Sequence, residues 1–524
     1  MATLLILLAW MQTPLLAEAG QETENWLSLG HEAEAAGKYE EALNIWVDAR
    51  ARMATPSIEM GLEYIRLATE QQLRGHYPMA ASFYQWALSA GRITERDHEL
   101  LSQELARLKP LAGEDEFREW TQLLALRDPL LLEKLTLFWN RLDPLPGRNY
   151  NPRLAEHWER IAYAKRHFQR RNEPPYGTDE RGPLYVQYGE PDHKETGFFP
   201  LKELDVRRLL QREEADASRE IIDILQREAG APHNYEIWIY YSPNEEMPFN
   251  LVLMFGEKAV GGFGQLHTLA DLIPSRLFTS QRGGYGFAAM AVLEIYYDHL
   301  STLDTYFSHL YQTSLSRRST ALVGGYATPS TISRSIRSQH SISTHQNMME
   351  APEQISTEEN NLPEIPLHVT QYRLLDEEGA PLLLSFLESR PTVAFLYDQE
   401  EEQVEDELLL GRYRLIHGMN LMNRDRNTLT QTRIYPTMII DPLQDSPSSS
   451  AFTLSYHPDG ATQLFFAELE NLDPEAPRQI ESLMPETVRG AGRLEVPLPE
   501  PLPLDGSLLL GDLILGFEKS AEPE

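Results

Sequence analysis

Carboxylates and one histidine lie around two turns near the middle of the chain. Asp179 and Arg181 belong to the first turn, and Glu190, Asp192 and His193 belong to the second. If the fold brought them together, these side chains could ligate a metal ion or transfer protons. Alternatively, Asp179 could cap its turn and form a local ion pair with Arg181. We favour this second interpretation and predict neither a catalytic residue nor a metal ligand here.

Motifs for other kinds of chemistry are missing from the sequence. There is no His-Glu-x-x-His zinc motif, no Gly-x-Ser-x-Gly nucleophile elbow and no Walker loop. The absence of cysteine excludes disulfides, zinc–thiolate sites and thiol nucleophiles. Residues 256–264 are rich in glycine but lack the spacing and the following helix that phosphate binding needs, so we predict a connection between strands.

An acidic segment over residues 398–407 offers the hard oxygen ligands that suit calcium. It lacks the Asp-x-Asp-x-Asp-Gly pattern of a calcium loop, and we interpret it as a solvated loop. No cofactor is therefore predicted.

The elements that would position Asp179 and Asp192 form a mixed α+β domain. Apolar residues at helical intervals mark the helices, and short runs of branched and aromatic residues mark the strands. The predicted helices are 154–168, 201–229 and 290–315. The predicted strands are 184–188, 236–241 and 251–255.

The first turn reads Pro175-Tyr176-Gly177-Thr178-Asp179 and is followed by an Arg-Gly pair, and the second turn ends the run Leu-Tyr-Val-Gln-Tyr-Gly-Glu-Pro-Asp. With these motifs, residues 136 to about 300 resemble the GWxTD domain family of exported bacterial proteins, which has no assigned biochemical function. Pro and Tyr replace the Gly and Trp of the family motif, whereas Thr and Asp are retained. The positions that carry the resemblance, with no role assigned, are Tyr176, Thr178, Asp179, Arg181, Gly182, Tyr188, Gly189, Pro191 and Asp192.

The N-terminal region contains an internal repeat. Aromatic, glycine and alanine residues recur at the spacing of a tetratricopeptide repeat, over residues 26–49 and again over 64–87. Small residues such as Gly30 and Ala42 let two antiparallel helices approach closely, and Gly37 makes the turn between them. Further helices are predicted over 97–108, 114–126 and 129–139. The repeats could either support the next domain or form a concave peptide-binding groove.

An apolar stretch opens the chain and ends in Ala17-Glu18-Ala19, a small-x-small cleavage pattern. The stretch lacks a preceding positive charge and Pro14 interrupts it, so a buried first helix is the alternative. We predict a cleaved signal peptide over residues 1–19, and hence export to the periplasm or the extracellular space. No later segment approaches the ~20 apolar residues of a membrane helix, so no integral membrane segment is predicted after cleavage.

The charge balance argues against a nucleic-acid partner. The chain carries 46 basic and 79 acidic residues, a formal net charge of −33, which repels phosphates. Its apolar fraction of 42% and charged fraction of 24% are typical of globular proteins. A length of 524 residues favours three folded parts over one.

The C-terminal part is predicted to follow a Ser/Thr-rich linker over residues 313–362. Short apolar runs punctuated by turn residues then predict an antiparallel β-sandwich. The predicted strands are 368–375, 382–387, 392–397, 433–440, 452–456, 462–467, 493–496 and 508–515. The last of these runs also resembles the end of many GWxTD family members.

The sequence thus predicts a multidomain protein with an all-α helical repeat, an α+β domain and a β-sandwich. The predicted parts are a signal peptide 1–19, helical repeats 20–135, a GWxTD-like α+β domain 136–312, a linker 313–362, a β-sandwich 363–518 and a tail 519–524.

We predict a non-catalytic binding or scaffold protein that holds a protein or peptide partner through its repeats. One alternative is an extracytoplasmic enzyme, for example a hydrolase, whose site would lie around Thr178, Asp179, Asp192 and His193. Another is a structural protein of the cell envelope. The oligomeric state is not predicted.

Overall fold

The protein is described by a computed structural model, whose residues fall into two compact units. The first unit takes in the described residues of 1–105, 114–159 and 356–524, and the second unit, here called the middle unit, takes in those of 106–113 and 160–355. The described residues are 25–143, 150–170, 175–210, 218–241, 250–257, 262–278, 288–324, 338, 364–376, 379–390, 413–423, 428–434, 447–457, 459–471 and 488–501. The predicted signal peptide, the acidic segment 398–407 and the predicted tail lie outside them.

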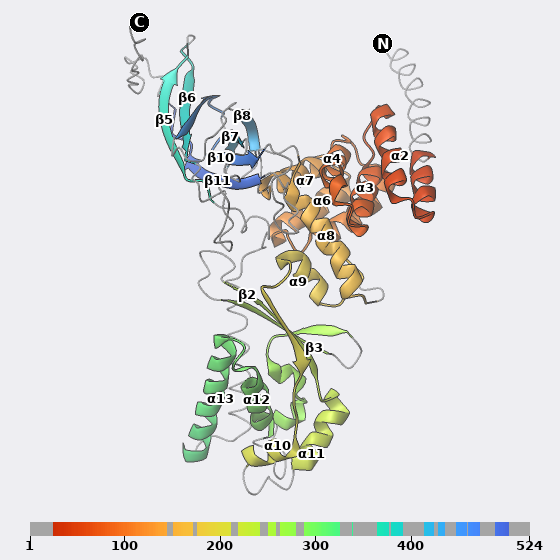
Figure 1. Cartoon of the computed structure of the whole chain (residues 1–524), viewed down its shortest axis with the longest axis vertical. Coiled ribbons are helices and arrows are strands. Elements are labelled where there is room, and N and C mark those ends of the chain that lie inside the picture. Colours follow the sequence, from red (N-terminus) through yellow and green to blue (C-terminus); the bar gives the residue numbers. More distant parts are fainter. Residues whose placement is uncertain are drawn as a thin grey trace, which may run out of the picture. The chain divides into compact units, whose positions relative to one another are not determined.

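Helices follow one another closely from residue 25 onward (Figure 1). They are a helix over 25–35, α2 (Tyr39–Arg52), α3 (Ile58–Glu70), α4 (Tyr77–Leu88), α5 (Glu95–Leu108), α6 (Glu114–Leu126), α7 (Leu130–Arg141) and α8 (Pro152–His167). The helices predicted over 97–108, 114–126 and 129–139 are confirmed.

Small residues allow these helices to pack closely, as the spacing predicts. A Cβ atom on Gly30 would lie 2.1 Å from the indole Nε1 of Trp46, so only glycine fits between the first two helices. Gly61 lies equally close to α4, where an added Cβ would be 2.4 Å from that of Ala87. Gly37 has a φ of +75°, the left-handed conformation that the turn before α2 requires.

The middle unit contains a four-stranded antiparallel sheet in the order β1-β2-β3-β4. Helices complete the unit. The strands are β1 (His193–Phe198), β2 (Asn234–Tyr240), β3 (Leu251–Glu257) and β4 (Phe263–Leu266). The helices are α9 (Arg181–Tyr188), α10 (Glu203–Leu209), α11 (Ser218–Ile224), a π-helix (Leu225–Ala229), two 3₁₀ helices (Leu269–Leu272 and Ser275–Phe278), α12 (Ala288–Leu300) and α13 (Thr305–Gly324).

The central strands β2 and β3 bury side chains on both faces of this sheet. Ile237 and Met254 join the apolar cluster that includes α12. Trp238 and Phe255 face the other way and join a cluster with α8 and α9. The strand predictions for this pair are confirmed, and the continuous apolar runs reflect cover on both sides.

Three predictions for the middle unit are wrong. Residues 184–188 form part of helix α9 instead of a strand, because the buried Tyr185 and Tyr188 recur at helical spacing within a run too short to reveal its period. The predicted helix 201–229 is interrupted, since α10 ends at Leu209 and Leu210 is extended with a ψ of 154°. The predicted helix 290–315 is two helices, with the Asp304 carboxylate accepting from the Tyr306 N–H at the start of α13. That helix continues to Gly324, beyond the predicted start of the linker.

Two antiparallel sheets occupy the C-terminal part. One has the order β5-β6-β9 and the other has the order β11-β10-β7-β8. Their strands are β5 (Leu367–Leu375), β6 (Pro381–Ser389), β7 (Tyr413–Met422), β8 (Thr428–Ile434), β9 (Ser448–Ser455), β10 (Thr462–Asn471) and β11 (Val488–Pro497). An apolar cluster joins Leu387 and Phe452 of the first sheet to Met419 and Phe465 of the second.

Most of the predicted C-terminal strands that fall on described residues are confirmed, although β7 was not predicted. Only the beginning of the predicted strand 433–440 coincides with a strand, the end of β8. The predicted strands 392–397 and 508–515 lie outside the described residues. Within the described part of the chain, no helix is both long and apolar enough to cross a membrane.

Candidate functional site

Arg181, the first residue of α9, forms the centre of a buried ion network in the middle unit. Its Nε and Nη2 atoms donate to the two carboxylate oxygens of Asp179 at 3.1 and 2.7 Å. Its Nη1 donates to Oε2 of Glu236 on β2 at 2.8 Å. The three side chains are only 12%, 3% and 6% exposed, so solvent screens this network little.

Two aromatic rings also contact the Arg181 guanidinium. Its Cζ lies 4.7 Å from the ring centre of Phe168 and 4.3 Å from that of Phe263. Burial alone lowers the pKa of Arg181, but the hydrogen bonds and charges of Asp179 and Glu236 outweigh burial and raise that pKa. The guanidinium therefore stays charged inside the fold.

Glu236 extends the network to a second cation. Its Oε1 accepts a 2.7 Å hydrogen bond from the indole of Trp238 and lies 2.9 Å from Nζ of Lys194 on β1. The network of Asp179, Arg181, Glu236 and Lys194 thus balances two carboxylates with two cations. Such balance is what allows charges to be buried at all.

Backbone hydrogen bonds fix Asp179 in this position. The Asp179 N–H donates to the Phe168 carbonyl at 2.9 Å, and Arg170 donates to the Gly177 carbonyl at 2.7 Å. Gly177 needs its positive φ of +72° for this turn. Gly182 lies directly against Thr178, since a Cβ there would be 1.8 Å from Oγ1.

Carboxylates also cover the free edge of β4, the last strand of the sheet. The outward N–H of Phe263 donates to Asp179 at 3.1 Å, and that of Gln265 donates to Glu180 at 2.7 Å. Just beyond the strand, the N–H of His267 donates to Asp271 at 3.1 Å. The three acids take the place of a neighbouring strand and block pairing with another chain at these positions.

The remaining residues of the family-like motif have structural contacts. Tyr176 is buried and donates from its hydroxyl to the Arg107 carbonyl at 2.5 Å, and burial raises the pKa of Tyr188 to about 12. Gly189 has a φ of +79° and accepts from the Tyr240 hydroxyl at 2.9 Å. Pro191 is partly exposed in the turn before β1.

The residues of the enzyme alternative do not gather at one point. The Asp192 carboxylate accepts from the Tyr241 N–H at 2.7 Å, while both oxygens of Asp179 accept from Arg181. His193 lies on β1 at 3.9 Å from Glu195, with 40% of its side chain exposed. This placement leaves Asp179 engaged in the ion network and gives it no contact with His193 among the described residues.

The sequence did not identify Glu236, Lys194 or Trp238 as part of this network. One signal was present, because Glu236 is a single acid inside the apolar run Tyr-Glu-Ile-Trp-Ile-Tyr. A charge in a strand buried on both faces requires a partner of opposite charge. That partner, Arg181, lies 55 positions away in the sequence.

A second candidate site lies on the N-terminal helices. The helix over 25–35, α3 and α5 are the first members of three successive helix pairs, and together they line a cavity of about 470 Å³. Leu27, His31 and Glu32 line it from the first helix. Glu59 of α3 and Arg96 of α5 complete it and form an ion pair of 2.8 Å.

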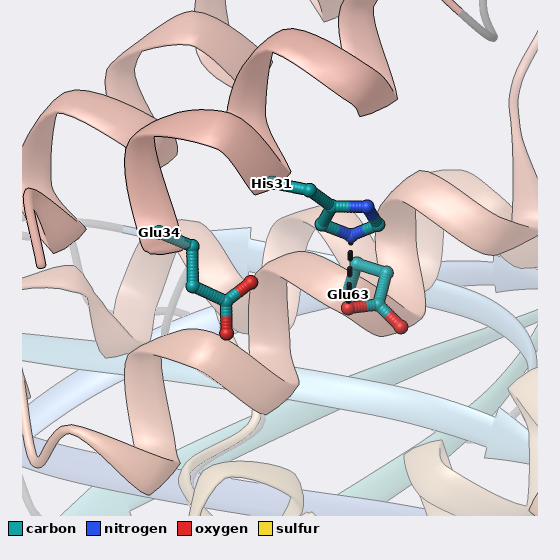
Figure 2. A group of neighbouring side chains, drawn as sticks. All are labelled: His31, Glu34 and Glu63. Atoms are coloured by element: carbon teal, nitrogen blue, oxygen red, sulfur yellow. Dashed lines mark ion pairs between the residues drawn. The ribbon is translucent and has the colours of Figure 1, made fainter. Parts of the chain in front are cut away.

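Figure 2 shows His31, Glu34 and Glu63 close together on this helical face. Their ligand atoms lie within 4.8 Å of one another, the one such group of three found among the described residues. However, Arg66 donates to both oxygens of Glu34 at 2.9 Å and pairs with Glu63 at 2.7 Å. A metal ion would have to displace this cation, so we assign no metal here.

No protein-family model matches the chain, and no curated protein matches it.

Proposed function

We propose that this protein is an exported binding or scaffold protein that holds a protein partner on the face formed by residues 25–35, α3 and α5. The observation that supports this best is the cavity of about 470 Å³ on that face. Three consecutive helix pairs contribute to it, so an extended segment could contact all of them at once.

Charge indicates which segment would fit. The side chains of this face include more carboxylates than cations, and a basic segment would complement them. The carboxylates are Glu32, Glu34, Glu59 and Glu63. Arg66 and Arg96 already pair with the last three of them, which leaves an excess of two negative charges on this face. We therefore propose a partner that presents Lys or Arg residues.

The finer architecture is part of the same proposal. We propose that the helix pairs are tetratricopeptide-like repeats, because Gly30, Gly37 and Trp46 fill the places that this repeat gives them. We propose that the middle unit is GWxTD-like and that the C-terminal sheets form a β-sandwich, which the apolar cluster shared by the two sheets supports. Export remains a proposal that rests on the apolar N-terminal stretch.

The test compares two arginine substitutions in the purified protein, residues 20–524. Ala35 is exposed on the helix over 25–35 and lines the cavity, whereas Ala125 is exposed on α6 and does not. Ala35→Arg adds bulk and positive charge to the cavity, and Ala125→Arg makes the same change elsewhere. The proteins are crosslinked chemically in an envelope extract, and the crosslinked partners are identified by mass spectrometry. We expect the partner to be crosslinked to the unsubstituted protein and to Ala125→Arg but not to Ala35→Arg.

Two results would count against the proposal. One is an identical set of crosslinked proteins for all three forms, and the other is no specific crosslink for the unsubstituted protein. N-terminal sequencing of protein purified from the envelope tests export separately, with residue 20 expected as the first residue.

A further inference from the structure

Arg50, in the last turn of α2, is a partly exposed cation that lies against α4. Its Cζ atom is 4.8 Å from the ring centre of Phe83 and 5.4 Å from that of Trp86. Its Nη1 donates to the Ser82 hydroxyl at 3.1 Å. No carboxylate pairs with this guanidinium among the residues that the structure describes.

The lack of an acid beside Arg50 contrasts with the composition of the chain, which has 79 acidic and 46 basic residues. On the next helix, α3, Arg66 pairs with three carboxylates. Burial lowers the pKa of Arg50, and only the Tyr64 side chain opposes this shift. Because an arginine remains protonated at neutral pH, Arg50 is a positive charge that no acid of the described chain balances.

The surface around Arg50 is apolar. Met79, Ser82 and Trp86 are spaced three and four residues apart, which places them on one face of α4. Met79 is 41% exposed, Trp86 is partly exposed, and α4 contains no charged residue. These three residues and Arg50 are here called the Arg50 face. None of them lines the cavity of about 470 Å³ on residues 25–35, α3 and α5.

The chemistry of the Arg50 face favours a carboxylate in a protein segment. A planar guanidinium presents its N–H groups as a fork that matches a carboxylate through two parallel hydrogen bonds. Arg, Trp and Met are also side chains in which protein–protein interfaces are enriched. Asp48, the acid nearest to Arg50 in the sequence, is two positions away and so faces another side of α2. The net charge of −33 disfavours a polyanion such as a nucleic acid or an anionic membrane.

We propose that the Arg50 face is a second docking surface of this protein. It binds a protein segment that presents an Asp or Glu carboxylate to Arg50 and an apolar side chain to Met79 and Trp86. This surface differs in place and in charge from the one proposed above, which takes a basic segment. The two proposals can therefore fail independently.

Selection from a phage-displayed library of short random peptides tests the proposal. The purified protein, residues 20–524, is the bait, and Arg50→Gln serves for counter-selection. Counter-selection removes every peptide that binds elsewhere on the protein. We expect the remaining peptides to carry Asp or Glu beside an apolar residue. Selection of no peptide, or of peptides without a carboxylate, would overturn the proposal.

Fluorescence anisotropy then measures the affinity of one selected peptide, labelled with fluorescein. Arg50→Gln should weaken binding roughly tenfold or more, because it removes the charged partner of the carboxylate. Arg52→Gln is the matched control. It removes the same charge from the same turn of α2, but Arg52 lies 5.3 Å from the ring centre of Trp26 on the first helix. Equal losses of affinity for the two variants would contradict the proposal.

Replacing the acid of the peptide with its amide separates a direct contact from a change of fold. The amide peptide should bind the unsubstituted protein more weakly than the acid peptide does. It should bind Arg50→Gln about as well as the acid peptide does, because the pair is already broken there. Losses that simply add would mean that the carboxylate and Arg50 do not meet.

Two further measurements test the apolar contact and the kind of partner. Met79→Ser should weaken peptide binding severalfold, whereas Leu126→Ser on α6, where Leu126 is 77% exposed, should not. Equal effects of these two variants would count against the apolar contact. Cosedimentation with phosphatidylglycerol vesicles that requires Arg50 would replace the protein segment with a lipid surface and overturn the proposal.

Discussion

Arg181 and His417 are two basic side chains buried in different regions of the molecule, and their surroundings differ. Arg181 in the middle unit contacts two carboxylates and two aromatic rings. His417 on β7 is 0% exposed, and its Nε2 and Nδ1 lie 2.7 and 2.8 Å from the hydroxyls of Ser389 and Ser450. Burial raises the cost of charge for both, yet only Arg181 has anionic partners to offset it.

The consequence is opposite ionisation. The carboxylates raise the pKa of Arg181 against the effect of burial, whereas burial lowers the pKa of His417 to about 4. A neutral imidazole has one donor and one acceptor, which two serine hydroxyls can satisfy. Ser389 and Ser450 belong to one sheet and His417 to the other, so these bonds join the two sheets without burying a charge.

Arg181→Met should have the largest effect, because it breaks the charge balance. The substitution leaves the buried carboxylate of Asp179 without a cation and leaves that of Glu236 with Lys194 alone. Breaking a buried ion pair costs about 3–5 kcal/mol. Hydrogen–deuterium exchange of β2 and β4, followed by mass spectrometry, should accelerate by roughly 100-fold or more.

A triple variant separates lost charge pairing from lost packing. Asp179→Asn and Glu236→Gln, added to Arg181→Met, remove both carboxylate charges that Arg181 neutralised, at nearly constant shape. The Lys194 ammonium loses its partner in this variant, but it is 40% exposed and solvent can screen it. Slower exchange in the triple variant than in Arg181→Met would support the charge explanation. Equal exchange in the two would refute it.

Because His417 is neutral in the folded protein, stability should decrease as the pH falls. Its folded pKa of about 4 lies below the ordinary value of 6.5, so the unfolded chain takes up this proton first as the pH falls. The stability that the neutral ring contributes is full above pH 6.5 and is lost between pH 6.5 and about 4. At 1.36 kcal/mol per pKa unit, the loss approaches about 3 kcal/mol.

Exchange of β6, β7 and β9 at several pH values, corrected for intrinsic rates, measures this loss. His417→Gln retains a donor and an acceptor but cannot be protonated, and it should flatten the pH dependence in that window. His368→Gln on β5 is the matched control, since His368 is exposed. If His417→Gln kept the full pH dependence of exchange, that pH dependence would have to come from groups other than His417.

A carboxylate that accepts a hydrogen bond from an exposed backbone N–H should contribute less to stability than one that pairs with a buried cation. Glu180→Ala removes the acceptor of the Gln265 N–H at the edge of β4. An exposed hydrogen bond of this kind contributes about 1 kcal/mol, so exchange of residues 262–268 should rise roughly fivefold. Glu203→Ala on α10 provides the control. If it raised the exchange of residues 262–268 equally, the effect of Glu180→Ala could not be attributed to the hydrogen bond at the edge of β4.

The parts of the fold that depend on local pattern could be predicted from the sequence. Helix spacing at the N-terminus and the apolar strands β2 and β3 show their period within each element. β7 escaped prediction because His417, Gly418 and Asn420 interrupt its apolar run.

The ion network could be predicted only in part. Asp179 and Arg181 are near neighbours in the sequence, and their ion pair is confirmed. The register between β1 and β2 brings Glu236 and Lys194 into this network, because Lys194 lies opposite Trp238 and Thr196 lies opposite Glu236. Contacts that a register creates have no local signal in the sequence.

Lys194→Met gives the smallest predicted effect and the sharpest test of what burial contributes. Lys194 and Arg181 pair with the same carboxylate, that of Glu236, at 2.9 and 2.8 Å. Distance therefore does not distinguish them, but the Lys194 side chain is 40% exposed and Arg181 only 12%. Solvent screens the exposed pair, so its loss should cost less than about 1 kcal/mol. Exchange of β2 should change little compared with Arg181→Met; equal acceleration would mean that the count of cations, and not their burial, stabilises this network.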